Sequence, residues 1–107
     1  MIGQYYLYII QCGDSDYYKI GVSDRPKHRL EKMQTANPYA LSIKRVYRFG
    51  TKLEAYASEA VTHRALSEHK ERGEWFELKH FKRIIWDRLV RGEAQQLEHE
   101  YKRRLSG

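Results

Sequence analysis

This 107-residue sequence supplies each type of side chain that phosphodiester hydrolysis requires. The reaction needs a group that deprotonates or orients a water molecule, and positive charge where the phosphorus centre gathers negative charge. Tyr8 and His63 carry a phenol and an imidazole, Lys19 and Arg29 carry positive charge, and Glu59 carries a carboxylate. One carboxylate is enough to anchor Mg²⁺, which keeps several of its own waters. The set therefore contains the minimum for metal-assisted cleavage.

A predicted β-hairpin positions two of these side chains. Two runs of aromatic and β-branched residues, Tyr5–Gln11 and Tyr17–Ser23, flank a short turn-rich segment. Side chains alternate between the two faces of a strand, so Tyr18 and Lys19 must point to opposite faces. Only one of them can join Tyr8.

A helix is predicted over residues 24–34, directly after the hairpin. Pro26 suits its first turn, and Ser23 and Asp24 can accept hydrogen bonds from its first N–H groups. Arg29 then lies beside the buried stripe of this helix, near the edge of the sheet. Its guanidinium can therefore share one surface with side chains of the hairpin.

A second helix is predicted to begin after the capping residue Thr51 and to run to about His69. Glu59 and His63 lie one turn apart on one flank of this helix. The neighbouring stripe is apolar and is expected to pack against the sheet; it consists of Leu53, Tyr56, Ala57, Ala60 and Val61.

The rest of the pattern predicts a small fold of the α/β (α+β) class, with a three-stranded mixed or antiparallel sheet flanked by helices. Lys70–Gly73 is expected to be a polar loop and Trp75–Leu78 a short edge strand. Leu41–Phe49 is the third strand, with three side chains predicted on one face: Ile43, Tyr47 and Phe49.

The C-terminal part is predicted to be helical. An amphipathic helix is expected from His80 to Arg91, and Gly92 weakens its continuation. The predicted domain therefore covers residues 1–91. Residues 92–107 are expected to form a helical or frayed basic extension.

Composition favours a polyanionic partner inside the cell. The 20 Lys and Arg exceed the 14 Asp and Glu, giving a net charge of +6 that favours phosphate contacts. The nine tyrosines can stack on bases. No stretch approaches the roughly 20 apolar residues of a membrane span, and no signal-peptide pattern is present. With Cys12 as the only cysteine, an internal disulfide and a cysteine-based zinc site are excluded, and a cytoplasmic location is expected.

The motifs resemble those of GIY-YIG nucleases. Tyr6-Leu7-Tyr8 stands where that family has its first motif, and Lys19-Ile20-Gly21 stands where it has its second. Lys19 follows Tyr8 by eleven positions and Arg29 follows Lys19 by ten, which is the usual spacing in the superfamily. Further elements match its small phage and bacterial branch in order: Gln34-Thr35-Ala36-Asn37-Pro38, Glu59, His63 and Gly73-Glu74-Trp75-Phe76. The resemblance covers Tyr5 to Leu78 and implies a GIY-YIG-like fold.

The resemblance implies a metal-dependent endonuclease. Tyr8 would be the general base or would position the water, Arg29 would hold the scissile phosphate, and Glu59 would bind Mg²⁺ or Mn²⁺. By the family's spacing Lys19 is the residue that joins Tyr8, where it replaces the usual tyrosine and adds charge. His63 would be a second base or would orient the leaving group.

The implied partner is nucleic acid, with DNA as the expected substrate. Basic and polar residues of the first helix and the loop after it would contact it: Arg25, Lys27, Lys32, Thr35 and Asn37. The sequence leaves open DNA or RNA, and a homodimer that cuts both strands. The alternative function is a nucleic-acid-binding module without hydrolysis, because Lys19 stands in place of the family's tyrosine.

Each assignment also has a structural alternative. Tyr8 could be a core tyrosine, and Glu59 could pair with Arg64. Arg29 could be a surface cation, with Arg25 taking its role. His63 could be a packed imidazole, and Thr35 and Asn37 could cap backbone groups in the loop.

Overall fold

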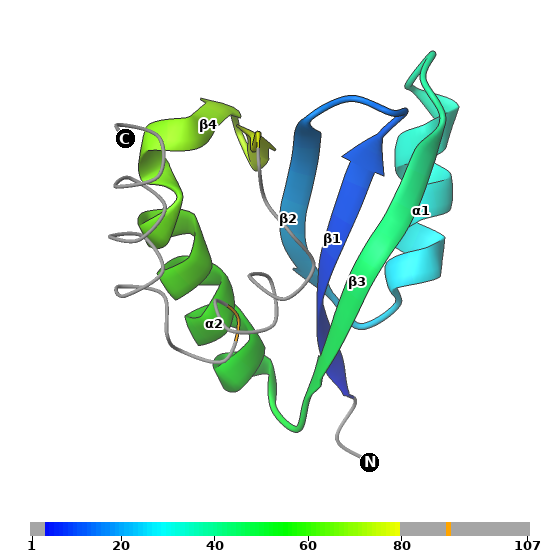
Figure 1. Ribbon diagram of the computed structural model, residues 1–107. Helices are drawn as coiled ribbons and strands as arrows, with labels where there is room; N and C mark the ends of the chain where they lie inside the picture. The colour runs from blue at the N-terminus through cyan, green and yellow to red at the C-terminus, as the bar shows by residue number, and fades with distance from the viewer. Residues whose placement is uncertain (1–3, 80–89, 91–107) are drawn as a thin grey trace.

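The computed structural model describes residues 4–79 and residue 90. The elements are β1 (Tyr5–Cys12), β2 (Tyr17–Ser23), α1 (Pro26–Thr35), β3 (Leu41–Phe49), α2 (Lys52–Ala65), the 3₁₀ turn η1 (Ser67–His69), β4 (Lys70–Arg72) and β5 (Trp75–Glu77). The strands form one antiparallel sheet in the order β3-β1-β2-β5-β4. Helices α1 and α2 flank opposite sides of the sheet (Figure 1). The structure is therefore of the predicted α+β class.

Strands β1 and β2 form the predicted hairpin. In their register Tyr8 lies opposite Gly21, and Ile10 lies opposite Lys19. Directly opposed residues of an antiparallel pair present their side chains on the same face. Tyr8 and Lys19 therefore share one face with Gly21, while Tyr18 packs against the core on the other face, as the alternation predicted.

Strand β1 lies between β2 and β3 and separates the core into two clusters. The cluster on the α1 side centres on Tyr8, Ile10 and Leu41, and two residues of α1, Leu30 and Met33, pack against it. The cluster on the α2 side is larger and includes Leu7, Ile9, Ile20, Val22, Ala55, Ala65, Leu66 and Phe76. Both faces of β1 are covered, which explains why its sequence is apolar on both parities.

The sheet has five strands, so the predicted three-stranded sheet is wrong. The stretch Lys70–Gly73, predicted to be a loop, contains β4, and the chain turns back at Gly73, whose φ of +58° favours glycine. Strand β5 is also not an edge strand, because it lies between β2 and β4. Strands of three residues carry almost no periodic signal, and β5 forms by pairing with the distant segment Tyr17–Lys19.

The third strand has the predicted bounds but contains a β-bulge. Ile9 and Ile10 of β1 pair with Arg45 and Ile43, so Lys44 is an extra residue on β3. Ile43 consequently packs on the α1 side. The prediction that it shares a face with two later residues is wrong, because these pack on the α2 side: Tyr47 and Phe49.

Helix α1 begins two residues later than predicted, at Pro26. Ser23 Oγ accepts a hydrogen bond from the backbone N–H of Arg25 at 3.0 Å, which stabilises the turn into the helix. Pro26 occupies the first helical turn as expected, where a missing N–H is not a loss.

Helix α2 has the predicted cap but buries a different face. Thr51 Oγ1 accepts a hydrogen bond from the Glu54 N–H at 3.1 Å. The helix ends at Ala65, short of the predicted His69, and continues as η1. The apolar stripe predicted to pack is largely exposed, with Leu53 80% and Tyr56 44% accessible. Smaller side chains allow the helix to approach the sheet closely instead: Ala55, Thr62 and Ala65.

The predicted helix from His80 to Arg91 and the division between residues 91 and 92 fall outside the described residues, except for Val90. Val90 belongs to the α2-side core, and its carbonyl accepts a hydrogen bond from Ser58 Oγ at 3.0 Å. No helix within the described residues combines the length and apolar character that crossing a membrane requires.

Candidate functional site

Tyr8 is the centre of the candidate site. Its side chain is only 1% exposed, and its ring lies directly over the backbone of Gly21. A Cβ atom added at residue 21 would lie 2.6 Å from Tyr8 Cζ and 3.1 Å from Glu74 Oε1. Glycine at this position therefore leaves the space through which the phenol reaches across β2.

The edge of β2 that Tyr8 approaches is only partly covered by β5. The last residue pair between these strands joins Lys19 to Trp75, and the Ile20 N–H then donates to the Glu74 carbonyl at 3.1 Å. Strand pairing stops there, and Glu74 stands at the point where it stops. Beyond this point the edge of β2 is open to side chains from α2.

His63 of α2 uses that open edge. Its Nε2 lies 2.8 Å from the Ile20 carbonyl oxygen, and because a carbonyl can only accept, Nε2–H is the donor. The imidazole also packs edge-on against Phe76, with ring centroids 5.0 Å apart. These contacts fix α2 against β2 and hold Glu59, one turn earlier, at the same end of the sheet. The hydrogen bond from Nε2 of His63 therefore positions α2 against β2.

Glu74 connects the groups around Tyr8. Its Oε1 lies 3.9 Å from Lys19 Nζ, and the Lys19 ammonium also stands 5.9 Å from the centroid of the Trp75 ring. The two side chains are partly exposed, at 21% for Lys19 and 41% for Glu74, so the ion pair alone adds little stability. Its effect is to orient the ammonium on the face of Tyr8.

Burial and nearby carboxylates keep the Tyr8 phenol protonated. Its pKa is raised to about 12, first by desolvation and then by the negative charges of Glu74 and Glu59. The Arg29 guanidinium acts in the opposite direction and lowers this pKa. Glu59, Glu74 and Arg29 therefore all lie close enough to Tyr8 for their charges to act on it.

Glu59 carries an unfavourable charge. Its pKa is raised because the side chain is partly buried and because the Glu74 carboxylate repels it, whereas His63 lowers it. The two carboxylates come from α2 and from the start of β5. The two carboxylates create a local excess of negative charge beside Tyr8. A bound cation would reduce the repulsion between them.

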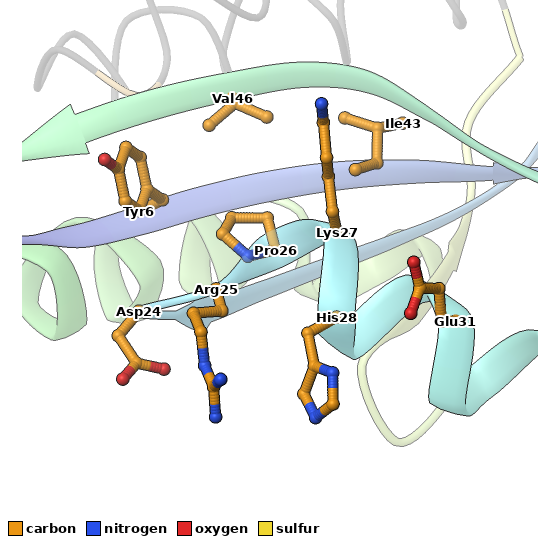
Figure 2. A pocket seen from close by; sticks show the side chains of 9 residues that line it. All are labelled: Tyr6, Asp24, Arg25, Pro26, Lys27, His28, Glu31, Ile43 and Val46. Atoms are coloured by element: carbon orange, nitrogen blue, oxygen red, sulfur yellow. The ribbon is translucent and has the colours of Figure 1, made fainter.

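The structure thus brings together four residues selected from the sequence: Tyr8, Lys19, Arg29 and Glu59. It adds Glu74 to them. The basic residues predicted to contact nucleic acid are Arg25, directly before α1, and Lys27 and Lys32 on α1. Arg25 and Lys27 line an open cavity of about 700 Å³ between α1 and β3. Figure 2 shows Lys27 extending toward Ile43 across this cavity, while Arg25 points away from β3.

The remaining three predicted contact residues occupy the second half of α1 and the loop after it. Lys32 is exposed. Thr35 Oγ1 donates to the Glu31 carbonyl at 3.1 Å, and Asn37 Oδ1 accepts from the Tyr39 N–H at 2.9 Å. Thr35 and Asn37 therefore both have local backbone partners, and one polar end of the Asn37 amide is already in use.

The donor set fits a hard divalent cation that keeps most of its waters. In the part of the chain that the structure describes, no three His, Cys, Asp or Glu side chains form a closed metal cage. Mg²⁺ does not need one, since one or two carboxylates suffice. Glu59 and Glu74 carry carboxylate oxygens whose mutual repulsion a cation would reduce. Glu59 is partly buried, and its raised pKa shows that its charge lacks compensation, so it would be the main ligand.

Comparison with known proteins identifies the family. A family model described as the T5orf172 domain matches residues 5–104. The chain belongs to the T5orf172 family. This domain is found in phage and bacterial nuclease-like proteins. No curated protein and no solved structure matched the chain.

Two residues of this T5orf172 domain matter more than the sequence indicated. Gly21 was noted only as part of a motif, yet its missing side chain makes room for the Tyr8 ring. Glu74 enters the sequence analysis only as part of the motif Gly73-Glu74-Trp75-Phe76, yet its charge acts on both Tyr8 and Glu59. The register of β1 against β2 places Gly21 opposite Tyr8, whereas the role of Glu74 depends on the pairing of β2 with β5, which joins segments more than fifty residues apart.

Gly21→Ala should disrupt the site and the fold together. The added methyl group overlaps the Tyr8 phenol, and overpacking of this kind costs about 1–3 kcal/mol of unfolding free energy. Urea denaturation measures the change. Gly50→Ala is the matched control, because nothing lies within 4 Å of a Cβ there, and it should change stability by less than about 0.5 kcal/mol. Equal effects of the two variants would contradict the packing of Tyr8 on Gly21.

Glu59→Gln should stabilise the T5orf172 domain at neutral pH. A glutamate whose folded pKa is raised favours the fold while protonated and loses this contribution as pH rises through that pKa. Glutamine lacks the charge, so the variant gains a small amount, about 0.5 kcal/mol, near pH 7. The gain should disappear at acidic pH, where Glu59 is protonated. Thermal melts of both proteins across pH test this, and a gain that grows on acidification would be inconsistent with it.

Proposed function

We propose that this T5orf172 domain is a metal-dependent endonuclease that hydrolyses phosphodiester bonds in DNA, on a GIY-YIG-like scaffold. One observation carries the proposal. Tyr8 of β1, Arg29 of α1 and Glu59 of α2 lie close enough together for the charges of Arg29 and Glu59 to act on the Tyr8 phenol. Lys19 lies on the same face as Tyr8. The spacing of the two motifs and the family's occurrence in nuclease-like proteins support the same activity.

In the proposed reaction Tyr8 orients the attacking water as a neutral phenol. A general base works best when its pKa is near the operating pH, and a pKa of about 12 leaves almost no phenolate at neutral pH. The buried hydroxyl can instead hold a water by hydrogen bonding. As the water oxygen bonds to phosphorus, the P–O bond to the leaving group breaks. The water gives up its proton to solvent, the leaving oxygen takes a proton from solvent, and Tyr8 stays protonated throughout.

The cations of the site bind the phosphate. Arg29 is the stronger candidate, because a guanidinium matches two phosphate oxygens at once, whereas an ammonium acts as a point charge. Lys19 is held by Glu74 and adds positive charge on the Tyr8 face. Mg²⁺ or Mn²⁺ held by Glu59, with Glu74 beside it, would supply further stabilisation of the negative charge that develops on phosphate oxygens. Both carboxylates are oxygen donors of the type these ions prefer.

The purified T5orf172 domain should nick supercoiled plasmid DNA in the presence of Mg²⁺. Glu59→Gln and Arg29→Ala should each reduce the rate at least about 100-fold, as expected when a group that stabilises the transition state is removed. Glu31→Gln, an exposed glutamate on α1, is the matched control and should retain the wild-type rate. Undiminished nicking by Glu59→Gln, with its fold intact, would remove the metal assignment.

Mg²⁺ should also stabilise the folded protein through Glu59, independently of cleavage. A cation that binds only the native state at ten times its Kd adds about 1.4 kcal/mol. This gain should appear as a higher Tm for the wild type and for Glu31→Gln, and it should be lost in Glu59→Gln. An unchanged Mg²⁺ response in Glu59→Gln would place the cation elsewhere.

The alternative is a nucleic-acid-binding module on the same scaffold. It is favoured by Lys19, which stands in place of the tyrosine usual in GIY-YIG nucleases and is already paired with Glu74. Such a module would bind DNA with a strong salt dependence and would not cleave it in Mg²⁺ or Mn²⁺. The nicking assay therefore separates the two functions.

A further inference from the structure

A second cavity lies on the Tyr8 face of the sheet, toward the end of β1 and the start of β2. It is open, has a volume of about 290 Å³, and is lined by Cys12, Tyr17, Asn37, Glu71, Arg72 and Trp75. Trp75 is adjacent in sequence to Glu74 and opposite Lys19 in the sheet, so it forms the wall between the cavity and the Tyr8 site. Tyr17 lies two residues before Lys19 on β2 and therefore on the same face. A polymer bound at Tyr8 would pass the mouth of this cavity.

The walls of the cavity suit a flat aromatic ligand. Tyr17 is 37% exposed, and Trp75 is partly exposed beside it. The Tyr17 hydroxyl bonds to Glu77, its cross-strand neighbour, which raises the Tyr17 pKa and fixes the ring at the rim. The Lys19 ammonium near the Trp75 ring holds the second aromatic group in place. Two oriented aromatic side chains provide stacking surface without requiring a particular base.

Polar groups at the rim match the edge and the backbone of a nucleotide. Asn37 Oδ1 is already bonded to the Tyr39 N–H, so the amide nitrogen is the end that can donate to a carbonyl or ring nitrogen of a base. Glu71 can accept from an exocyclic amino group, and Arg72 can contact a phosphate. Donor, acceptor and cation are thus arranged around an aromatic site.

We propose that this cavity receives one unpaired nucleobase next to the scissile phosphate, so that the preferred substrate is DNA with a single-stranded flap, overhang or gap. A base within an intact duplex presents neither its faces nor its pairing edge, so it would first have to leave the stack. The space is sufficient for a single base and is bounded below by the sheet at Cys12. This inference rests on the proposed nuclease function, whose scissile phosphate it places beside Tyr8.

Binding of oligonucleotides to the full chain tests the inference without cleavage. With Glu59→Gln as the background, fluorescence anisotropy compares a flapped duplex with a blunt duplex of the same sequence. The flapped duplex should bind more tightly, and Tyr17→Ala should weaken its binding about 5- to 150-fold, the effect of losing one base–aromatic stack. The matched control is Tyr39→Ala, since Tyr39 is 65% exposed and does not line the cavity. It should leave binding unchanged.

Two further measurements locate the base. An abasic nucleotide at the first unpaired position should weaken binding as much as Tyr17→Ala, and combining the two changes should add little, because they remove the same contact. Asn37→Asp keeps an oxygen for the Tyr39 N–H but removes the amide donor, and it should weaken flap binding while leaving Tm near that of the background protein.

The outcomes separate this inference from the nuclease proposal. Equal affinity for flapped and blunt duplexes, or equal losses in Tyr17→Ala and Tyr39→Ala, would overturn the base site even if the wild type cleaves DNA. Tyr17-dependent flap binding by a wild type that never cleaves would support the base site and contradict the nuclease function.

Discussion

The incomplete pairing of β2 with β5 is the constraint on which the site depends. If β5 covered the whole edge of β2, the sheet would separate α2 from the face on which Tyr8 lies. Because pairing ends at Lys19 and Trp75, the Ile20 carbonyl is open to His63, and α2 can bring Glu59 to the far side of the sheet edge. Gly21 is the next residue after Ile20, and because it has no side chain it leaves space for the Tyr8 ring.

This arrangement conflicts with stability in a way that is typical of functional sites. The pKa values of Tyr8 and Glu59 are both raised, first by burial and then by the negative charge of Glu74, and Glu59 adds to the effect on Tyr8. An arrangement selected for folding alone would place cations or apolar groups there. Perturbed pKa values from both burial and like charge, in residues from separate elements, are the pattern expected where chemistry or ligand binding takes place.

Local signals in the sequence were sufficient for the hairpin, for the bounds of β3 and for the cap at Thr51, because each depends on neighbouring residues. Long-range contacts decided the rest. The three-residue strands β4 and β5 form only by pairing, so the sequence predicted a loop and an edge strand there. The bulge at Lys44 moved Ile43 to the other face. In α2, two stripes carry apolar residues, and closeness to the sheet selected the one with smaller side chains.

The residues of the candidate site also divide into those that sequence motifs identify and those that only long-range contacts identify. Motif spacing selected Tyr8, Lys19, Arg29 and Glu59, which the fold places near one another. It could not assign Glu74, because the influence of this residue arises from the register of β5 against β2.

The bulge in β3 also affects how copies of this chain can meet. Among the described strands β3 is at one end of the sheet, and the outer edge of a nine-residue end strand is a template for strand-to-strand association. The extra residue at Lys44 interrupts the regular ladder, and two further cations follow it at Arg45 and Arg48. Like charges and an irregular backbone disfavour continuous sheets across molecules, so this edge protects a small, tyrosine-rich protein against aggregation.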